Sequence, residues 1–386
     1  AGFTEHVETD PWPDGPGGRF LVRDGTLLAW SVPPGGTASR PLRVFAAHTD
    51  SPTLKVKPQP DGGAAGWRQV GVEVYGGALW NSWLDRDLGL AGRLVRYDGS
   101  VLLVDVHRPL LRVPQLAIHL DRQVNQGLTL DPQQHLTPVW GLGAAADLLE
   151  FLADEVADLD PNDVAAHDLV VHDVTPPARL GAQEELLAAP RLDNLASVHA
   201  GIGALLDAAQ QGDTVPVFVG FDHEEVGSAS ATGAQGPLLE NVLTALAGGF
   251  DARARVFAAS RCLSVDVTHA AHPNYPDRHD PGHHAVPNRG PALKVNAIQR
   301  YATDAPGAAA WRRACRDADV PAQVFVSRNT VPCGSTVGPL LATRLGIRTV
   351  DVGIPVLSMH SARELCGVAD PGFLRAAGAA FLSDPA

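Results

Sequence analysis

Short apolar runs rich in β-branched residues alternate along the chain with longer segments rich in Ala and Leu. The run Val215–Phe221 is too brief for a typical helix, and its composition predicts a buried strand. Similar runs predict strands at 41–50, 260–269, 322–327 and 349–355, and longer segments predict helices at 191–206, 308–318, 336–345 and 371–381. This alternation predicts an α/β domain whose mixed sheet is flanked by helices.

The pattern changes between residues 58 and 178. Here Asp98-Gly99 predicts a hairpin turn, residues 114–120 and 169–174 predict strands, and residues 141–159 predict one amphipathic helix. A chain of 386 residues is also long for one compact domain. We therefore expect a discontinuous α/β domain made of residues 1–57 and 179–386, interrupted by an inserted β-rich domain over 58–178.

Ionisable residues gather where the predicted strand Val215–Phe221 ends. Asp222, His223, Glu224 and Glu225 follow it directly. Four such side chains at the end of a buried strand are costly unless a partner such as a bound cation compensates them. A solvated acidic turn is the alternative.

Other predicted strands end in the same residue types. His48 and Asp50 lie two apart, so both side chains face the same way on a strand. That spacing suits a metal-bound imidazole whose second nitrogen is held by a carboxylate, although structural His–Asp pairs are equally common. Asp193 stands at a helix start, where capping is the alternative role. Asp266, His269 and His360 also lie at or just after strand ends.

Together these residues offer two or more histidines and several carboxylates. Because strands of an α/β sheet place such ends at one edge, a common site is expected. The donor set fits a two-zinc centre better than a structural zinc, which would favour Cys, and Co²⁺ or Mn²⁺ would fit the same ligands. The adjacent Glu224 and Glu225 suit divided roles, one binding metal and one moving a proton.

Charge and composition exclude several other classes of protein. The formal net charge of −13 argues against nucleic acid or anionic membrane as a partner. No apolar run approaches the length of a membrane span. The first ten residues contain neither a basic nor an apolar leader region, and the four cysteines form no CxxC pair. We expect a soluble cytoplasmic protein, with a trimmed leader left open because no initiator Met is present.

Several motifs then resemble one family. They are HTDSP (48–52), RLDNL (191–195), FDHEEVGS (221–228), HPNYP (272–276), GPALKVNAIQRYAT (290–303), GSTVGP (334–339) and VDVGIPVLSMHSARE (350–364). In this order, and with YGGALWNSWLDRDLGLAGR (75–93), they resemble the aspartyl aminopeptidase family of metallo-aminopeptidases over nearly the whole chain. The implied fold is an α/β zinc-peptidase domain with an inserted β-rich dimerisation domain.

The resemblance also implies roles for individual residues. Two zinc ions would be held by five ligands: His48 and Asp266 on one ion, Glu225 and His360 on the other, and Asp193 bridging them. Glu224 would be the general base and acid, and Asp50 would orient His48. Four further residues would contact substrate: His119, His269, Lys294 and Tyr301.

The implied activity is release of an N-terminal residue from peptides, with Asp or Glu expected and neutral or hydrophobic residues as the alternative. The family typically assembles as a tetrahedral homododecamer built from dimers, and His119 would reach a neighbouring subunit's site. Two rival hypotheses remain: a deacylase or carboxypeptidase of the same fold, and a non-catalytic assembled scaffold. Neither nucleic acid nor membrane is an expected partner.

Overall fold

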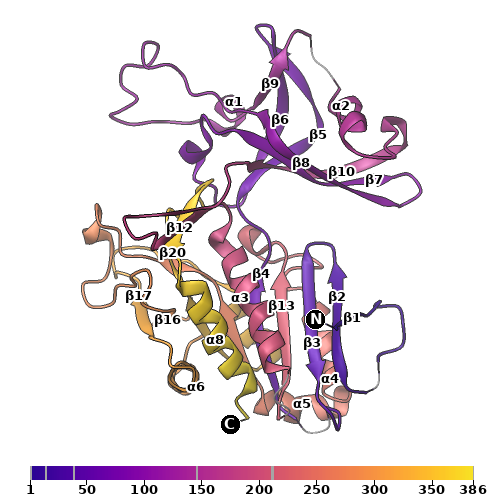
Figure 1. Ribbon diagram of the computed structural model, residues 1–386, viewed down its shortest axis with the longest axis vertical. Coiled ribbons are helices and arrows are strands. Elements are labelled where there is room, and N and C mark those ends of the chain that lie inside the picture. The colour runs from indigo at the N-terminus through magenta and orange to yellow at the C-terminus, as the bar shows by residue number, and fades with distance from the viewer. Residues whose placement is uncertain (1, 14, 38–39, 145–146, 210–212, 386) are drawn as a thin grey trace. The chain divides into compact units, whose positions relative to one another are not determined.

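The chain forms two compact units, seen in a computed structural model that describes residues 2–13, 15–37, 40–144, 147–209 and 213–385 (Figure 1). The first unit contains residues 1–51, 178–359 and 364–386, and the second contains residues 52–177 and 360–363. Strand β5 (Thr53–Ala64) is continuous, so residues 53–57 lie in the sheet of the second unit. No helix among the described residues has the length and apolar character that a membrane crossing requires.

A nine-stranded mixed sheet forms the centre of the first unit. Its order is β1 (Thr4–Glu5), β2 (Gly17–Arg23), β3 (Thr26–Val32), β13 (Val215–Phe221), β4 (Leu42–His48), β14 (Arg261–Val265), β18 (Arg348–Gly353), β16 (Ala292–Val295) and β17 (Gln323–Val326). The four central strands β13, β4, β14 and β18 are parallel to one another. Their carboxyl ends therefore lie at the same edge of the sheet.

Helices cover both faces of this sheet. One face carries α3 (Leu192–Ala208), α6 (Ala305–Asp317) and α8 (Asp370–Ser383), and the other carries α4 (Leu238–Leu246), α5 (Phe250–Ala259) and α7 (Val337–Leu345). Side chains alternate along β4: Phe45 and Ala47 pack with the first helix layer, while Val44 and Ala46 pack with the second. Both faces of the strand are buried, which explains its apolar run from Val44 to Ala47.

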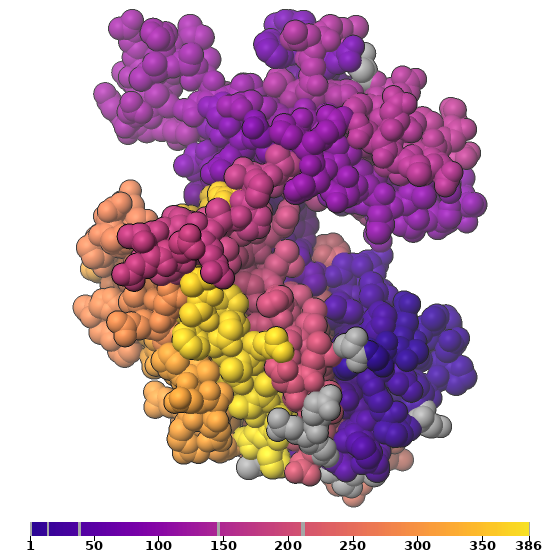
Figure 2. Space-filling model, viewed as in Figure 1, coloured from indigo at the N-terminus to yellow at the C-terminus, as the bar shows by residue number. Residues whose placement is uncertain are grey.

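Helix α3 lies unusually close to the sheet. A Cβ atom at Gly201 would lie 2.6 Å from Phe45 Cε1 and 2.7 Å from Phe218 Cε2, so only glycine allows this approach. The neighbouring helix α8 is joined to α3 by the Arg375–Asp207 ion pair at 2.8 Å. Figure 2 shows α8, in yellow, on the surface of this unit beside α3. The packing fixes the position of the first turn of α3, where Asp193 lies.

A smaller five-stranded sheet completes the first unit. Its order is β11 (Ala178–Leu180), β12 (Leu186–Ala189), β20 (Glu364–Gly367), β19 (Pro355–Leu357) and β15 (Thr268–His269). The predicted single strand over 260–269 is therefore two strands. Strand β14 pairs with β18 and β15 pairs with β19, so the chain passes from one sheet to the other at Asp266.

The second unit is built on a six-stranded antiparallel sheet. Its order is β8 (Val101–Leu111), β7 (Leu88–Arg96), β10 (Val164–Asp173), β5, β6 (Trp67–Tyr75) and β9 (Val139–Leu142). Two short helices accompany it, α1 (Pro132–His135) and α2 (Leu148–Glu155). Leu90, Val106 and Val171, on three neighbouring strands, are buried in one apolar cluster with Leu152 of α2.

Two predictions for the second unit were wrong. Residues 114–120, predicted as a strand, form an irregular segment that ends in a turn, and Leu116, Ile118 and Leu120 are exposed. Their apolar alternation resembles a strand, but this segment pairs with no strand among the described residues. The helix predicted over 141–159 is limited to Leu148–Glu155, because Asp147 caps it and the residues before it pair with β6 as strand β9.

Candidate active site

The site begins at His48, the last residue of β4. Its side chain is almost fully buried, and its Nε2 lies 3.3 Å from Asp193 Oδ1 and 3.6 Å from Asp266 Oδ1. Asp266 directly follows β14, the parallel neighbour of β4. Burial alone would lower the pKa of His48, but hydrogen bonds with Asp193, Asp266 and Asp50 outweigh it and raise that pKa well above its usual value. These carboxylates therefore favour positive charge at this position.

Asp50 connects His48 to the Glu224-Glu225 turn. His48 Nδ1 lies 3.0 Å from the Asp50 carbonyl oxygen and 3.4 Å from its Oδ1. The two carboxylate oxygens of Asp50 accept hydrogen bonds from the backbone N–H groups of Glu224 and Glu225, both at 3.1 Å. One carboxylate thus orients the imidazole and fixes the turn that follows β13.

Glu224 and Glu225 belong to a single 3₁₀ turn, Glu224–Val226. Burial raises the pKa of Glu224 to about 7; His48 opposes this shift, and the nearby carboxylates of Asp266 and Asp193 add to it. His223, just before the turn, has a left-handed φ of 61°. Such a conformation is costly for a residue with a side chain and persists where the surrounding structure holds it in place.

Asp193 enters the site from the first turn of α3. Asp193 lies at a kink near the start of α3, where it has a non-helical ψ of 105°. Its backbone is held on both sides: its N–H donates to Glu364 Oε2 at 2.8 Å, and its carbonyl accepts from Ser51 Oγ at 2.7 Å. The peptide bond between Asp193 and Asn194 is cis.

Glu364 and Ser51 were not singled out by the sequence analysis. Glu364 lies inside the motif VDVGIPVLSMHSARE and Ser51 inside HTDSP, and each motif also contains a candidate metal ligand. Their closeness to these ligands in the sequence was the signal that could have identified them. Glu364 is 2% exposed although it carries a carboxylate. Such burial requires hydrogen-bond partners, and the N–H of Asp193 supplies one of them.

The predicted substrate-binding residues of the first unit lie next to Asp266. Lys294 is buried, and its Nζ donates to the carbonyl oxygens of Asp266 at 3.1 Å and Val267 at 2.9 Å. It lies 3.7 Å from Asp266 Oδ2 and 4.9 Å from the centre of the Tyr301 ring. Burial raises the pKa of Tyr301 above its usual value. The exposed His269 packs its ring against Phe325, which also contacts Tyr301.

Two predicted site residues belong to the second unit. His119 is exposed in the turn over 118–120. His360 begins the segment 360–363, and its Nδ1 lies 3.0 Å from the Gly77 carbonyl oxygen. One peptide bond joins His360 to Met359, which packs against the core of the first unit.

The first unit thus gathers His48 and a set of carboxylates: Asp50, Asp193, Glu224, Glu225 and Asp266. Two groups of potential metal ligands have ligand atoms within 4.8 Å of one another, His48 with Asp193 and Asp266, and His48 with Glu224 and Glu225. Five carboxylates around one imidazole need compensating positive charge. Nitrogen and oxygen donors without thiolate are those of catalytic rather than structural zinc sites. The residues therefore fit a catalytic zinc centre.

A cluster of this kind at the carboxyl edge of an α/β sheet defines a metal-dependent hydrolase. The family model of the aminopeptidase I zinc metalloproteases (M18) matches residues 1–381. The chain belongs to the M18 family and is a zinc metallo-aminopeptidase, a hydrolase of peptide bonds.

Relatives and solved structures agree with this assignment. A probable M18 family aminopeptidase 2 of Streptomyces coelicolor is 58% identical over 393 residues, covering 99% of this chain and 91% of that protein. Its counterpart in Mycobacterium leprae is 50% identical, with 99% and 92% covered. The structure of Ape4 in complex with Nbr1 matches with a TM-score of 0.94 at 37% identity, covering 99% of this chain and 80% of that one. The mApe1 dodecamer of S. cerevisiae matches with a TM-score of 0.85 at 29% identity, covering 99% and 89%.

Proposed function

We propose that this zinc aminopeptidase uses two zinc ions to release N-terminal Asp or Glu from peptides. His48 and Asp266 would hold one ion, Glu225 and His360 the other, and Asp193 would bridge them. The observation that carries this proposal is the convergence of Asp193 Oδ1 and Asp266 Oδ1 on His48 Nε2, at 3.3 and 3.6 Å. Zinc in such a site supplies Lewis acidity and lowers the pKa of bound water.

The residues of the chain then perform the proton transfers. Glu224 accepts a proton from the attacking water and delivers it to the leaving amine, as a general base and then a general acid. A pKa raised by burial suits both steps, because the carboxyl group then gains and loses its proton closer to neutral pH than a solvated carboxyl group does. Asp50 keeps Glu224 in place through the backbone N–H and keeps the His48 ring oriented.

The substrate's side chain would be selected near Lys294 and Tyr301, with His269 at the same edge. Lys294 is one of only three lysines in the sequence, and its ammonium group lies beside a proposed ligand of the metal. A cation at that position would favour a carboxylate side chain on the substrate. Selection of neutral or hydrophobic N-terminal residues is the alternative.

A homo-oligomer, expected as a tetrahedral dodecamer built from dimers, would complete the site through His119. Support comes from the dodecameric state of the mApe1 neighbour and from the exposed side chains of Leu116, Ile118 and Leu120 around His119. Exposed apolar side chains clustered in one segment are typical of surfaces that another chain covers. Peptides are the proposed substrates, and neither nucleic acid nor membrane is a proposed partner.

A cytoplasmic location is also proposed. All four cysteines are thiols without a disulfide in the described part of the chain, as expected in a reducing compartment.

The test is a panel of amino-acyl nitroanilides assayed with zinc, cobalt and manganese, alongside metal counting by mass spectrometry. We expect at least two ions per chain and fastest hydrolysis of the Asp and Glu substrates, with no turnover of their N-acetylated forms. Hydrolysis of the N-acetylated substrates would instead support a deacylase. Absence of bound metal and of turnover with every substrate would support a scaffold. One ion per chain in a fully active enzyme would contradict the two-ion assignment.

A further inference from the structure

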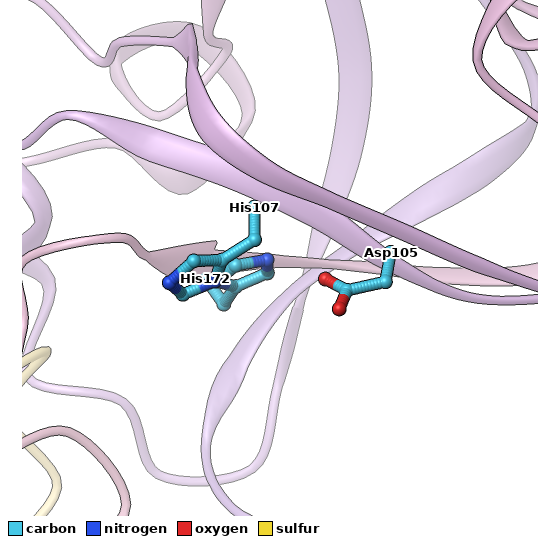
Figure 3. Close-up of side chains that lie close together, drawn as sticks. All are labelled: Asp105, His107 and His172. Carbon is cyan, nitrogen blue, oxygen red and sulfur yellow. The ribbon is translucent and has the colours of Figure 1, made fainter.

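We propose a second, separate metal site in the second unit, in which Asp105, His107 and His172 bind a divalent cation of the zinc type. Figure 3 shows the three side chains together on the strands that carry them. One ligand atom from each lies within 4.8 Å of the other two. All three residues belong to the second unit, so this site is independent of the zinc centre in the first.

The strand register places these residues on one face of the sheet. Asp105 and His107 are two apart on β8, and His172 lies on β10, with β7 between the two strands. Asp105 is opposite Ala91 of β7, and His172 is opposite Gly89. Alternate residues of a strand share a face, so the central strand presents only Gly89 and Ala91 between the potential ligands.

Gly89 makes room for the buried imidazole. A Cβ atom there would lie 2.9 Å from both Cε1 and Nε2 of His172, so the ring lies across β7 in the space that a side chain would fill. It reaches the ring of His107, with ring centroids 5.3 Å apart and an interplanar angle of 11°. His172 is 5% exposed, whereas His107 and Asp105 are exposed. One ligand is therefore fixed by packing and two are accessible.

The donor set fits zinc. Two imidazoles and one carboxylate are nitrogen and oxygen ligands of the kind that catalytic zinc sites use, with a fourth position left to water. The Asp173 carbonyl oxygen lies 3.5 Å from His172 Nδ1, whereas Nε2 is the ring nitrogen beside Gly89. Because a nitrogen lone pair lies in the ring plane, the exposed His107 ring would turn out of its stacked position to bind the same ion as His172.

A bound ion would connect β8 to β10 across β7. Strand β8 is at one end of the sheet order, and Val101 and Leu103 on it are exposed. An ion that binds the folded sheet and not the unfolded chain stabilises the fold by mass action. We therefore expect this site to stabilise the edge of the second unit.

The test uses the full-length chain, stripped of metal with a chelator and then titrated with Zn²⁺. We expect the parent protein to bind one more ion per chain than His107→Ala, or to bind that ion at least about 10-fold more tightly. Loss of a hydrogen-bond partner of a metal ligand typically lowers the affinity for the metal by roughly 10–100-fold, so loss of a ligand itself should lower it at least as much. Asp105→Asn should weaken the same ion. Heat denaturation should show a smaller zinc-dependent rise in Tm for both variants.

His167→Ala is the matched control, because His167 lies on the same strand as His172 but on the opposite face. It should bind zinc as the parent does. The proposal is overturned if His107→Ala and Asp105→Asn keep the ion count and affinity of the parent, or if His167→Ala loses as much as they do. His107 and Asp105 are exposed, so these variants should fold even if His172→Ala does not. Nitroanilide hydrolysis, measured in parallel, shows separately whether the zinc centre of the first unit is still active.

Discussion

The carboxylate of Asp50 accepts a hydrogen bond from the backbone N–H of Glu224 at 3.1 Å, which joins the end of β4 to the turn after β13. Its other oxygen accepts from the N–H of Glu225, also at 3.1 Å. A residue that was expected only to orient His48 therefore also fixes the backbone of the proposed general base and its neighbour.

Asp50→Asn should weaken zinc binding. An amide would direct its NH₂ group at one of the two backbone N–H groups, and the His48 ring would lose one of its three anionic neighbours. The affinity of the proposed centre for zinc should fall roughly 10–100-fold, as it typically does when a residue that hydrogen-bonds a metal ligand is replaced. Competition with a chromophoric chelator measures this loss. Asp222→Asn is the control, because the Asp222 carboxylate lies in the same loop and accepts from His223 N–H, which an amide oxygen can also do. Equal affinities in parent and Asp50→Asn would remove Asp50 from this role.

Glu224→Gln should keep zinc but lose most turnover. The amide is similar in shape and cannot accept a proton, so kcat should fall roughly 10²–10⁴-fold. Steady-state assays on the best nitroanilide, together with the zinc content of the same sample, measure both effects. Asp222→Asn again serves as the control and should retain the parent rate within a few-fold. A Glu224→Gln enzyme with the parent rate would show that the proton is moved by another group.

The pH profile of kcat/KM should report the ionisation of Glu224. A general base works in its deprotonated form, so the rate should rise with pH through the pKa of this carboxyl group. Burial raises that pKa from 4.5 to about 7, and the positive charge of bound zinc acts in the opposite direction. The rising limb should therefore lie between these two values. The residual activity of Glu224→Gln should lack this limb; if the limb persists unchanged, it belongs to another residue.

Lys294→Met should distinguish two roles for this buried cation. If it selects acidic substrates, kcat/KM should fall far more for Asp and Glu nitroanilides than for Ala and Leu ones. Its contacts with the Asp266 and Val267 carbonyl oxygens give the competing outcome, a similar loss on every substrate because Asp266 is displaced. Lys55→Met is the control, since Lys55 pairs with Asp168 in the second unit. A uniform loss would contradict the selective role.

His119 should act on the site of a neighbouring subunit. A donor placed near the developing oxyanion is typically worth roughly 10²–10³ in rate, so His119→Phe should be nearly inactive. The test dissociates Glu224→Gln and His119→Phe oligomers and reassembles them as a mixture. Some mixed interfaces would then pair an intact Glu224 with an intact His119, and activity should partly return. Each variant reassembled alone is the control, and a mixture no more active than these would contradict action between subunits.

The sequence by itself determined the central strands and the chemistry at their ends. Val215–Phe221 and the strand ending at His48 are buried on both faces, so composition alone identified them, and their ionisable residues followed directly. The strand predicted at residues 114–120 was wrong, because a segment with alternating apolar residues forms a strand only where a partner strand lies beside it.

Tertiary structure decided which residues contact one another at the ends of the central strands. Glu364 and Ser51 hold Asp193 from positions far away in the sequence, and the roles of Asp50 depend on two strands becoming neighbours. His172 and His107 meet only because β7 places Gly89 between them. Residue types and local spacing encode which chemistry a chain can perform, whereas long-range strand pairing decides which of those residues come within contact distance.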